Sequence, residues 1–127
     1  MGHETLFMQF KVLVVEDEYL VREVAVGALQ DAGFHVLGAA DGEEALAHCK
    51  DDVPDLLFTD IRLPGEVDGW QIAQTCRERH PTLPVVYATT FSMDERRAVP
   101  GSVMFRKPYT PDQLVGVVRA LAGRGFQ

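Results

Sequence analysis

Short apolar runs alternate with helical stripes along almost the whole chain. Residues 12–15 form a continuous β-branched run, which is typical of a strand covered on both faces. Residues 20–32 follow with apolar side chains at helical spacing, and Gly33 ends this predicted helix. The alternation predicts four further strands, at 35–39, 56–59, 84–88 and 103–105.

Polar residues mark where the later helices begin. Asp41 is followed three residues on by Glu44, the spacing of a capping box. Asp68 precedes the next helical stripe, and Thr110 with Gln113 repeats the capping pattern before the last one. These signals separate the helices from the strands without a long linker.

The order of elements predicts an α/β fold with a five-stranded parallel sheet and helices on both faces. The segment 91–101 after the fourth strand has the weakest helical pattern, because Pro100 and Gly101 end any helix there after about two turns. We expect this helix to be short or mobile. We expect one domain over 11–122, preceded by an extension at 1–10 and followed by a tail at 123–127.

Composition narrows the class of protein. The chain has 127 residues, 46% of them hydrophobic and 24% charged, as in a soluble globular domain. Its net charge of −7 argues against nucleic acid or an anionic membrane as a direct partner. No apolar stretch is long enough to span a membrane, and the N-terminus has no secretory pattern. We therefore expect a cytoplasmic protein in which Cys49 and Cys76 are reduced packing residues.

Polar side chains that could take part in a chemical reaction stand at the ends of different predicted strands. Glu16 and Asp17 follow the first strand, Asp60 the third, Thr89 the fourth and Lys107 the fifth. Each alone is an ordinary loop, capping or surface residue. Since ligands bind at the carboxyl ends of open parallel sheets, we expect the five to converge on one rim.

Such a set suits metal-assisted phosphoryl chemistry. Three crowded carboxylates repel one another by about 4 kcal/mol per close pair at an effective dielectric near 20. Mg²⁺ relieves that repulsion, keeps waters and also binds phosphate oxygens. A carboxylate can then attack a phosphoryl group, Lys107 supplies a compensating cation, and the Thr89 hydroxyl can donate a hydrogen bond.

Four segments together resemble the receiver domain of bacterial response regulators. They are VLVVEDE (12–18), LLFTDIRLPG (56–65), VVYATT (85–90) and FRKPY (105–109), and the resemblance spans about residues 11–122. It implies a flavodoxin-like sheet in the order 2-1-3-4-5, and a phosphoryl group delivered by a sensor histidine kinase or a histidine phosphotransfer protein. Output would come from a phosphorylation-dependent change in the helix after the fourth strand, the fifth strand and the last helix.

The resemblance also implies a role for each site residue. Asp60 would be the phosphoacceptor, Thr89 the switch hydroxyl and Lys107 the conserved lysine. Mg²⁺ would be held by Glu16, Asp17 and Asp60 together with the backbone carbonyl of Arg62. The peptide bond between Lys107 and Pro108 would be cis.

The sequence departs from the family at the switch. Met104 stands where most receivers have Tyr or Phe, and Phe105 is one place off and should point to the other face of its strand. Thr90 replaces the usual Ala or Gly. The run from Tyr87 to Phe91 is similar to an alphaproteobacterial subgroup with a Phe-Ala-Thr-Gly-type motif.

Alternatives to a stand-alone receiver remain at this point. The chain could be a receiver cut from a larger response regulator or hybrid kinase. It could instead be a Mg²⁺-dependent phosphohydrolase, although Arg62 stands where such enzymes want a second acid. A pseudo-receiver that has lost phosphorylation is the third alternative. The main prediction is a signalling domain that assists its own phosphorylation, not an enzyme with a separate substrate.

Overall fold

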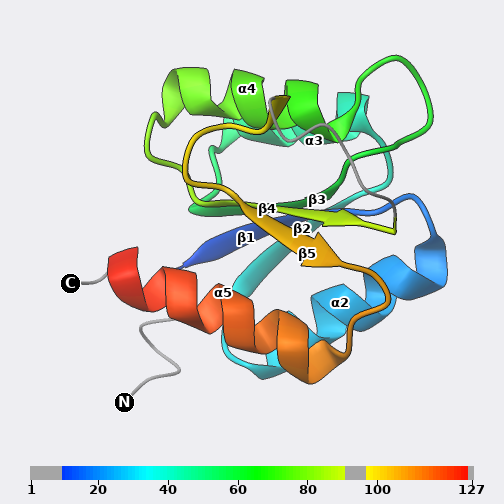
Figure 1. Ribbon diagram of the computed structural model, residues 1–127, viewed down its shortest axis with the longest axis vertical. Coiled ribbons are helices and arrows are strands. Elements are labelled where there is room, and N and C mark those ends of the chain that lie inside the picture. Colours follow the sequence, from blue (N-terminus) through cyan, green and yellow to red (C-terminus); the bar gives the residue numbers. More distant parts are fainter. Residues whose placement is uncertain (1–9, 91–96, 126–127) are drawn as a thin grey trace.

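The computed structural model describes residues 10–90 and 97–125, in which strands and helices alternate as predicted (Figure 1). The strands are β1 (Lys11–Val15), β2 (His35–Ala39), β3 (Leu56–Asp60), β4 (Val85–Thr89) and β5 (Val103–Arg106). The helices are α2 (Tyr19–Asp31), α3 (Gly42–Asp51), α4 (Gly69–Arg79) and α5 (Pro111–Gly125). The last helix therefore continues past residue 122.

All strand pairs are parallel, and the sheet has the order β2-β1-β3-β4-β5. This confirms the doubly wound, flavodoxin-like order that the resemblance implied. Because β1 and β3 lie at the centre, the strand ends that carry Glu16 and Asp60 are neighbours in the sheet.

Each face of the sheet is covered by a pair of helices, α3 with α4 on one side and α2 with α5 on the other (Figure 1). Leu13 and Val15 of β1 belong to the core under α3 and α4. Val12 and Val14 point the other way, into the core under α2 and α5. All four side chains are fully buried, which explains why the strand is a continuous apolar run instead of an alternating one.

The last strand separates its two large side chains as expected. Met104 packs against the core under α3 and α4, and Phe105 against the opposite core. Phe105 also makes edge contacts with Phe58, at a centroid distance of 6.1 Å. An aromatic side chain of β5 is thus present, but on the face away from α4.

The predicted helix starts are confirmed. The Asp68 side chain accepts from the Gln71 N–H at 2.9 Å, and the Gln71 side chain accepts from the Asp68 N–H at 2.8 Å. Thr110 and Gln113 make the same reciprocal pair at the start of α5. At α3, Asp41 caps the Glu44 N–H, but the Glu44 carboxylate accepts from Ala40 N–H, one residue before the cap.

The connection between β4 and β5 is described only in part. Residues 91–96, on which most of the expected short helix falls, lie outside the described residues. Residues 97–101 make a bend and a turn, with Gly101 at φ 78°. Val99 is buried in the core under α3 and α4. Among the helices of the described residues, none is long and apolar enough to cross a membrane.

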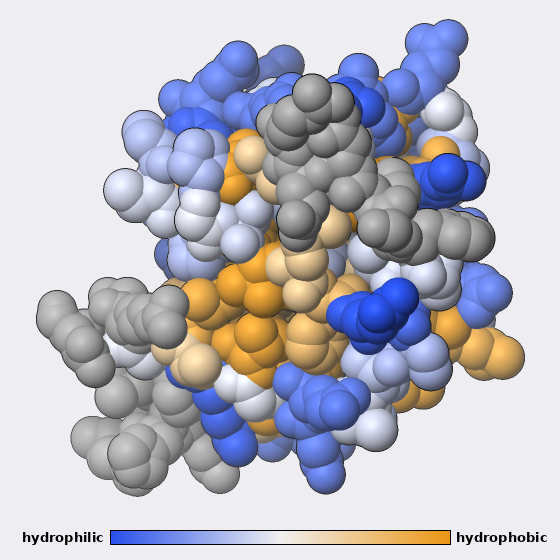
Figure 2. Space-filling model, in the orientation of Figure 1, coloured by the Kyte–Doolittle hydropathy of each residue, from blue (hydrophilic) through white to orange (hydrophobic). Residues whose placement is uncertain are grey.

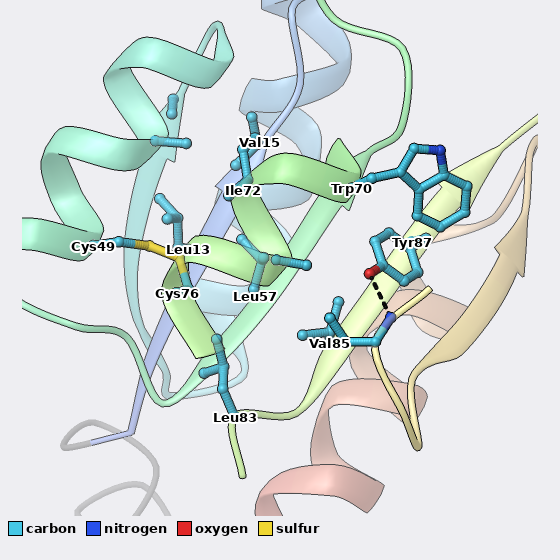
Figure 3. Packing of buried hydrophobic residues seen from close by; sticks show 14 of the residues in the cluster. Leu13, Val15, Cys49, Leu57, Trp70, Ile72, Cys76, Leu83, Val85 and Tyr87 are labelled. Atoms are coloured by element: carbon cyan, nitrogen blue, oxygen red, sulfur yellow. Dashed lines mark hydrogen bonds between the residues drawn. A yellow bond between two sulfur atoms is a disulfide. The ribbon is translucent and has the colours of Figure 1, made fainter. Parts of the chain in front are cut away.

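Cys49 and Cys76 form a disulfide, so the prediction of two reduced cysteines is wrong (Figure 3). They are far apart in sequence, but α3 and α4 pack side by side on one face and bring the Cα atoms to 5.8 Å, a normal disulfide spacing. That proximity belongs to the tertiary fold and has no signature in the spacing of the cysteines. Since disulfides are rare in reducing compartments, the cysteines no longer support a cytoplasmic location.

Helix α4 begins in close contact with the end of β3. The Gly69 N–H donates to the Ile61 carbonyl at 2.8 Å, and a Cβ at Gly69 would lie 2.2 Å from the Asp60 carbonyl oxygen. The atoms it would meet are backbone atoms, which cannot turn aside as a side chain would. The glycine therefore lets α4 start directly against the residue that ends β3.

Reduction of the disulfide should lower the free energy of unfolding by about 3 to 4 kcal/mol, because the reduced unfolded chain regains the freedom of a long loop. Urea denaturation with and without a dithiol reductant measures this change. The double variant Cys49→Ala/Cys76→Ala is the control and should not respond to reductant. Two reactive thiols in the unreduced, denatured wild type would contradict the disulfide.

Gly69→Ala should destabilise the fold by about 1–3 kcal/mol, the usual cost of overpacking against backbone. The matched control is Gly116→Ala in α5, where a Cβ would meet nothing within 4 Å. That variant should gain roughly 0.5–1 kcal/mol from helix propensity. Equal denaturation midpoints for the two variants would show that the close contact at Gly69 has no energetic consequence.

Candidate functional site

Four strands end at one edge of the sheet, and each delivers a polar residue there. Glu16 directly follows β1, Asp60 is the last residue of β3, Thr89 is the last of β4 and Lys107 directly follows β5. The strands are parallel, so these residues share the carboxyl edge. The geometry brings together residues that are up to 91 positions apart in sequence.

Lys107 is the centre of this arrangement. Its Nζ lies 2.8 Å from Asp60 Oδ1 and 2.9 Å from Glu16 Oε1. Its own backbone N–H donates to the Thr89 carbonyl at 2.9 Å, which fixes the end of β5 against the end of β4. The peptide bond from Lys107 to Pro108 is cis, as the resemblance implied.

Three carboxylates gather beside the lysine. Glu16, Asp17 and Asp60 each offer an oxygen, and these oxygens lie within 4.8 Å of one another. Glu16 and Asp60 are only 3% and 5% exposed, whereas Asp17 is open to solvent. Two of the acids are therefore held in the protein, and the third stands at the surface beside them.

The charges of the buried groups are shifted by their surroundings. Burial raises the pKa of Asp60 to about 7 against the effect of the Lys107 hydrogen bond, and the nearby Glu16 raises it further. Burial also acts to raise the pKa of Glu16, but hydrogen bonds from the Glu18 N–H and from Lys107 hold it below its usual value. Burial acts to lower the pKa of Lys107, but its bonds to the two carboxylates raise it instead.

These pKa shifts determine which of the three groups carries a proton near neutral pH. Lys107 is an ammonium and Glu16 a carboxylate, while Asp60 can change its charge near neutral pH. A cation beside Asp60 would favour its ionised form, since opposite charges within a few ångströms lower a carboxyl pKa. The carboxyl group with the raised pKa is thus the one whose reactivity a metal ion would control.

A cavity of about 150 Å³ opens at this edge. That is room for several water molecules, each of which takes roughly 30 Å³ in the liquid. Its lining includes five of the six residues expected at the site, namely Asp17, Asp60, Arg62, Thr89 and Lys107, together with Ile61, Ala88 and Thr90. Glu16 lies outside this lining, but its carboxylate contacts Lys107, which lines the cavity.

The donor set fits a small hard cation. Carboxylate oxygens beside a solvent-accessible cavity suit Mg²⁺, which binds one or two carboxylates and keeps several waters. The ligand count from the three acids is low enough to leave positions for water or phosphate oxygens. A softer metal would want His or Cys, and the acidic group contains neither.

Sequence reasoning missed Arg22, which steadies the acidic loop. Its Nη1 donates to the Glu16 carbonyl at 2.7 Å from the first half of α2. The Glu16 side chain is also held, since its Oε2 accepts from the Glu18 N–H at 3.0 Å. An arginine one turn into the helix that follows an acidic pair was the available signal.

A larger cavity of about 620 Å³ adjoins the site between the first halves of α2 and α5. It shares Glu16, Asp17 and Lys107 with the site, and much of its remaining lining is apolar: Leu20, Val21, Val24, Ala25, Pro108, Pro111 and Leu114. Leu20 and Val24 are 75% and 58% exposed. An apolar surface therefore runs from α2 up to the carboxyl edge.

Comparison with known proteins shows which family the chain is similar to. A family model described as the response regulator receiver domain matches residues 12–119. Response regulator Rre1 of Synechocystis sp. is 38% identical over 121 residues, which cover 89% of this chain and 52% of Rre1. The chain thus spans about half the length of that relative.

Solved structures agree. A response regulator receiver protein from Sinorhizobium medicae has a TM-score of 0.84 at 33% identity, over 90% of this chain and 94% of the other. The chemotaxis response regulator CheY4 of Vibrio cholerae has a TM-score of 0.79 at 30% identity, over 88% of this chain and 98% of CheY4. This chain therefore belongs to the response-regulator receiver family, signalling domains whose standard function is to accept a phosphoryl group.

Proposed function

We propose that Asp60 is the phosphoacceptor of this receiver, and that Lys107 and Thr89 assist it. The observation that carries the proposal is the position of the Lys107 ammonium, within 2.9 Å of both Asp60 and Glu16 at the mouth of a cavity. Among the described residues, Asp60 is also the one buried carboxylate that lines this cavity. The same edge of the sheet thus holds a nucleophile, a cation and space for a phosphoryl group.

Mg²⁺ would be held by Glu16, Asp17 and Asp60 together with the backbone carbonyl of Arg62. When bound, it would neutralise carboxylate charge and polarise the phosphoryl oxygens. Asp17 is the solvent-facing ligand of this set, and Glu16 is anchored by Lys107 and by the Glu18 N–H. The protein's part is to keep the acids close together before the metal arrives.

Receiver domains interact with histidine kinases or phosphotransfer proteins, and we propose a phosphohistidine of such a protein as the donor. An Asp60 carboxylate oxygen attacks the phosphorus and the P–N bond breaks. The bonding electron pair stays on the ring nitrogen of the histidine, which takes a proton from water. Asp60 becomes an acyl phosphate. The Lys107 ammonium balances the added charge, and the Thr89 hydroxyl donates to a phosphoryl oxygen.

The donor protein would approach beside α2. The apolar surface of Leu20 and Val24 leads directly to Asp17 and Lys107, so a partner seated there has access to Asp60. Apolar residues exposed next to a reactive group give a partner area to bury without blocking the group itself.

Output would come from the surface made by β5 and α5. Figure 2 shows apolar atoms gathered at the centre of the face on which Figure 1 shows both β5 and α5. Val103, Met104 and Phe105 of β5 are only partly buried. Since Lys107 directly follows β5, this surface adjoins the site.

Asp60→Asn should abolish phosphorylation, because the amide is not a nucleophile. Incubated with Mg²⁺ and acetyl phosphate, the wild type should gain the mass of one phosphoryl group and the variant none. Asp51→Asn, an exposed residue at the end of α3, is the matched control and should behave as the wild type. A phosphorylated Asp60→Asn protein would refute the assignment of the acceptor.

Asp17→Ala should weaken Mg²⁺ binding by at least about tenfold, the effect of losing even a supporting contact in many metal sites. Calorimetric titration measures it. Glu18→Ala, which removes the same charge from the next residue but not from the acidic group, is the matched control. Equal Mg²⁺ affinity in the two variants would count against Asp17 as a ligand. Metal-free thermal stability should be preserved in both, since both side chains are exposed.

A further inference from the structure

Tyr87 lies directly behind the site, on the sheet face that carries Met104. It is fully buried in β4, and its partner in the parallel register is Met104 of β5. Thr89 stands two residues further along β4, so both side chains project from the same face of the strand. Between them Ala88 is the register partner of Asp60. The aromatic side chain that β5 lacks on this face is therefore supplied by β4.

The Tyr87 hydroxyl reaches across to the connection that follows β4. It accepts a hydrogen bond from the Val99 N–H at 3.1 Å in a buried setting. The ring packs edge-on against Trp70 in the first turn of α4, with 4.7 Å between centroids. Figure 3 shows Tyr87 between Trp70 and the hydrogen-bonded backbone nitrogen. One side chain thus joins β4, α4 and the segment 97–101.

Contacts from α4 hold the same segment at the surface. The Arg97 guanidinium lies 5.9 Å from the centroid of Trp70 and 3.6 Å from Asp68 Oδ2. The Gln74 side chain donates to the Arg97 carbonyl at 3.5 Å. These attachments are weak, because the Arg97 side chain is half exposed and ion pairs in water contribute little.

The buried bond to Tyr87 is the stronger attachment. Val99 is 8% exposed and Tyr87 fully buried, so breaking their bond leaves a donor without water to replace its partner. Met104, the β5 residue that packs against the same core, has a flexible thioether side chain that adapts to several arrangements. Within the described residues, the segment 97–101 is therefore fixed to the sheet by this one buried hydrogen bond together with the packing of Ala98 and Val99 against the core under α3 and α4.

We propose that Tyr87 is the positioning residue that passes the phosphorylation state of Asp60 to the segment 97–101, a role that rests on the proposed function of Asp60. When Thr89 is drawn toward a phosphoryl group on Asp60, the end of β4 moves, and Tyr87 carries that displacement to the Val99 backbone. Met104 yields to the movement and transmits little of it. The coupling path is thus β4 itself, and not an aromatic side chain of β5.

The test removes only the hydroxyl, with Tyr87→Phe. In the unphosphorylated full chain, the Val99 amide should exchange roughly threefold to tenfold faster, the loss expected for one buried hydrogen bond. With Mg²⁺ and acetyl phosphate the variant should still gain one phosphoryl group by mass. The chemical-shift difference between its phosphorylated and unphosphorylated forms should shrink by more than half at residues 97–105.

Two further variants complete the design. Tyr19→Phe, which removes a hydroxyl from an exposed tyrosine of α2, should keep the full response. Met104→Ala should lose much less of it than Tyr87→Phe. A full response in Tyr87→Phe, or a larger loss in Met104→Ala, would overturn the inference.

These experiments also distinguish a failure of the coupling role of Tyr87 from a failure of the proposed function of Asp60. If the wild type takes up no phosphoryl group, the proposed function fails and the coupling role falls with it. If phosphorylation is normal and only the response of Tyr87→Phe is unchanged, the coupling role alone fails. Should Tyr87→Phe not fold, hydrogen exchange of the Val99 amide in the wild type, with and without phosphorylation, replaces that arm; an exchange rate that phosphorylation leaves unchanged would then contradict the proposal.

Discussion

The buried contact of Lys107 with Asp60 and Glu16 is the interaction on which the site depends. Two carboxylates held at 3% and 5% exposure carry a large desolvation cost, and an ammonium within 2.9 Å of both offsets it. The compensation is incomplete at Asp60, whose pKa is raised to about 7 by burial. A carboxylate left partly uncompensated is stabilised by a cation placed beside it. The Asp60 carboxylate would therefore favour the binding of a cation at this site.

The fold supplies this contact by topology. Parallel strands bring their carboxyl ends to one edge, so residues from β1, β3 and β5 meet although the chain separates them widely. The sheet is buried on both faces by α2 with α5 and α3 with α4, which keeps the edge fixed. Gly69 lets α4 start against the Asp60 backbone, and Arg22 ties the loop after β1. These contacts hold the backbone of Asp60 and of Glu16 in place beside Lys107.

The strands, the helix starts and the grouping of site residues could be predicted from the sequence, because each rests on a local pattern or on the rule that parallel strands share an edge. The order of the strands in the sheet came from the resemblance to receiver domains. Contacts between elements could not. The Cys49–Cys76 disulfide, the Arg22 bond to Glu16 and the Tyr87 bond to Val99 all depend on how a helix or turn is oriented in three dimensions. Met104 is an example. The sequence showed that it departs from the family, but not that Tyr87 on β4 packs beside it.

Chemical trapping of the phosphorylated residue tests the central claim most directly. After incubation with Mg²⁺ and acetyl phosphate, borohydride reduces an acyl phosphate to an alcohol, and peptide mass spectrometry locates the reduced side chain. The arrangement around Lys107 predicts that the reduced residue is Asp60 and that no other acid is labelled. Label on Glu16, Asp17 or another carboxylate, with Asp60 unchanged, would contradict the account.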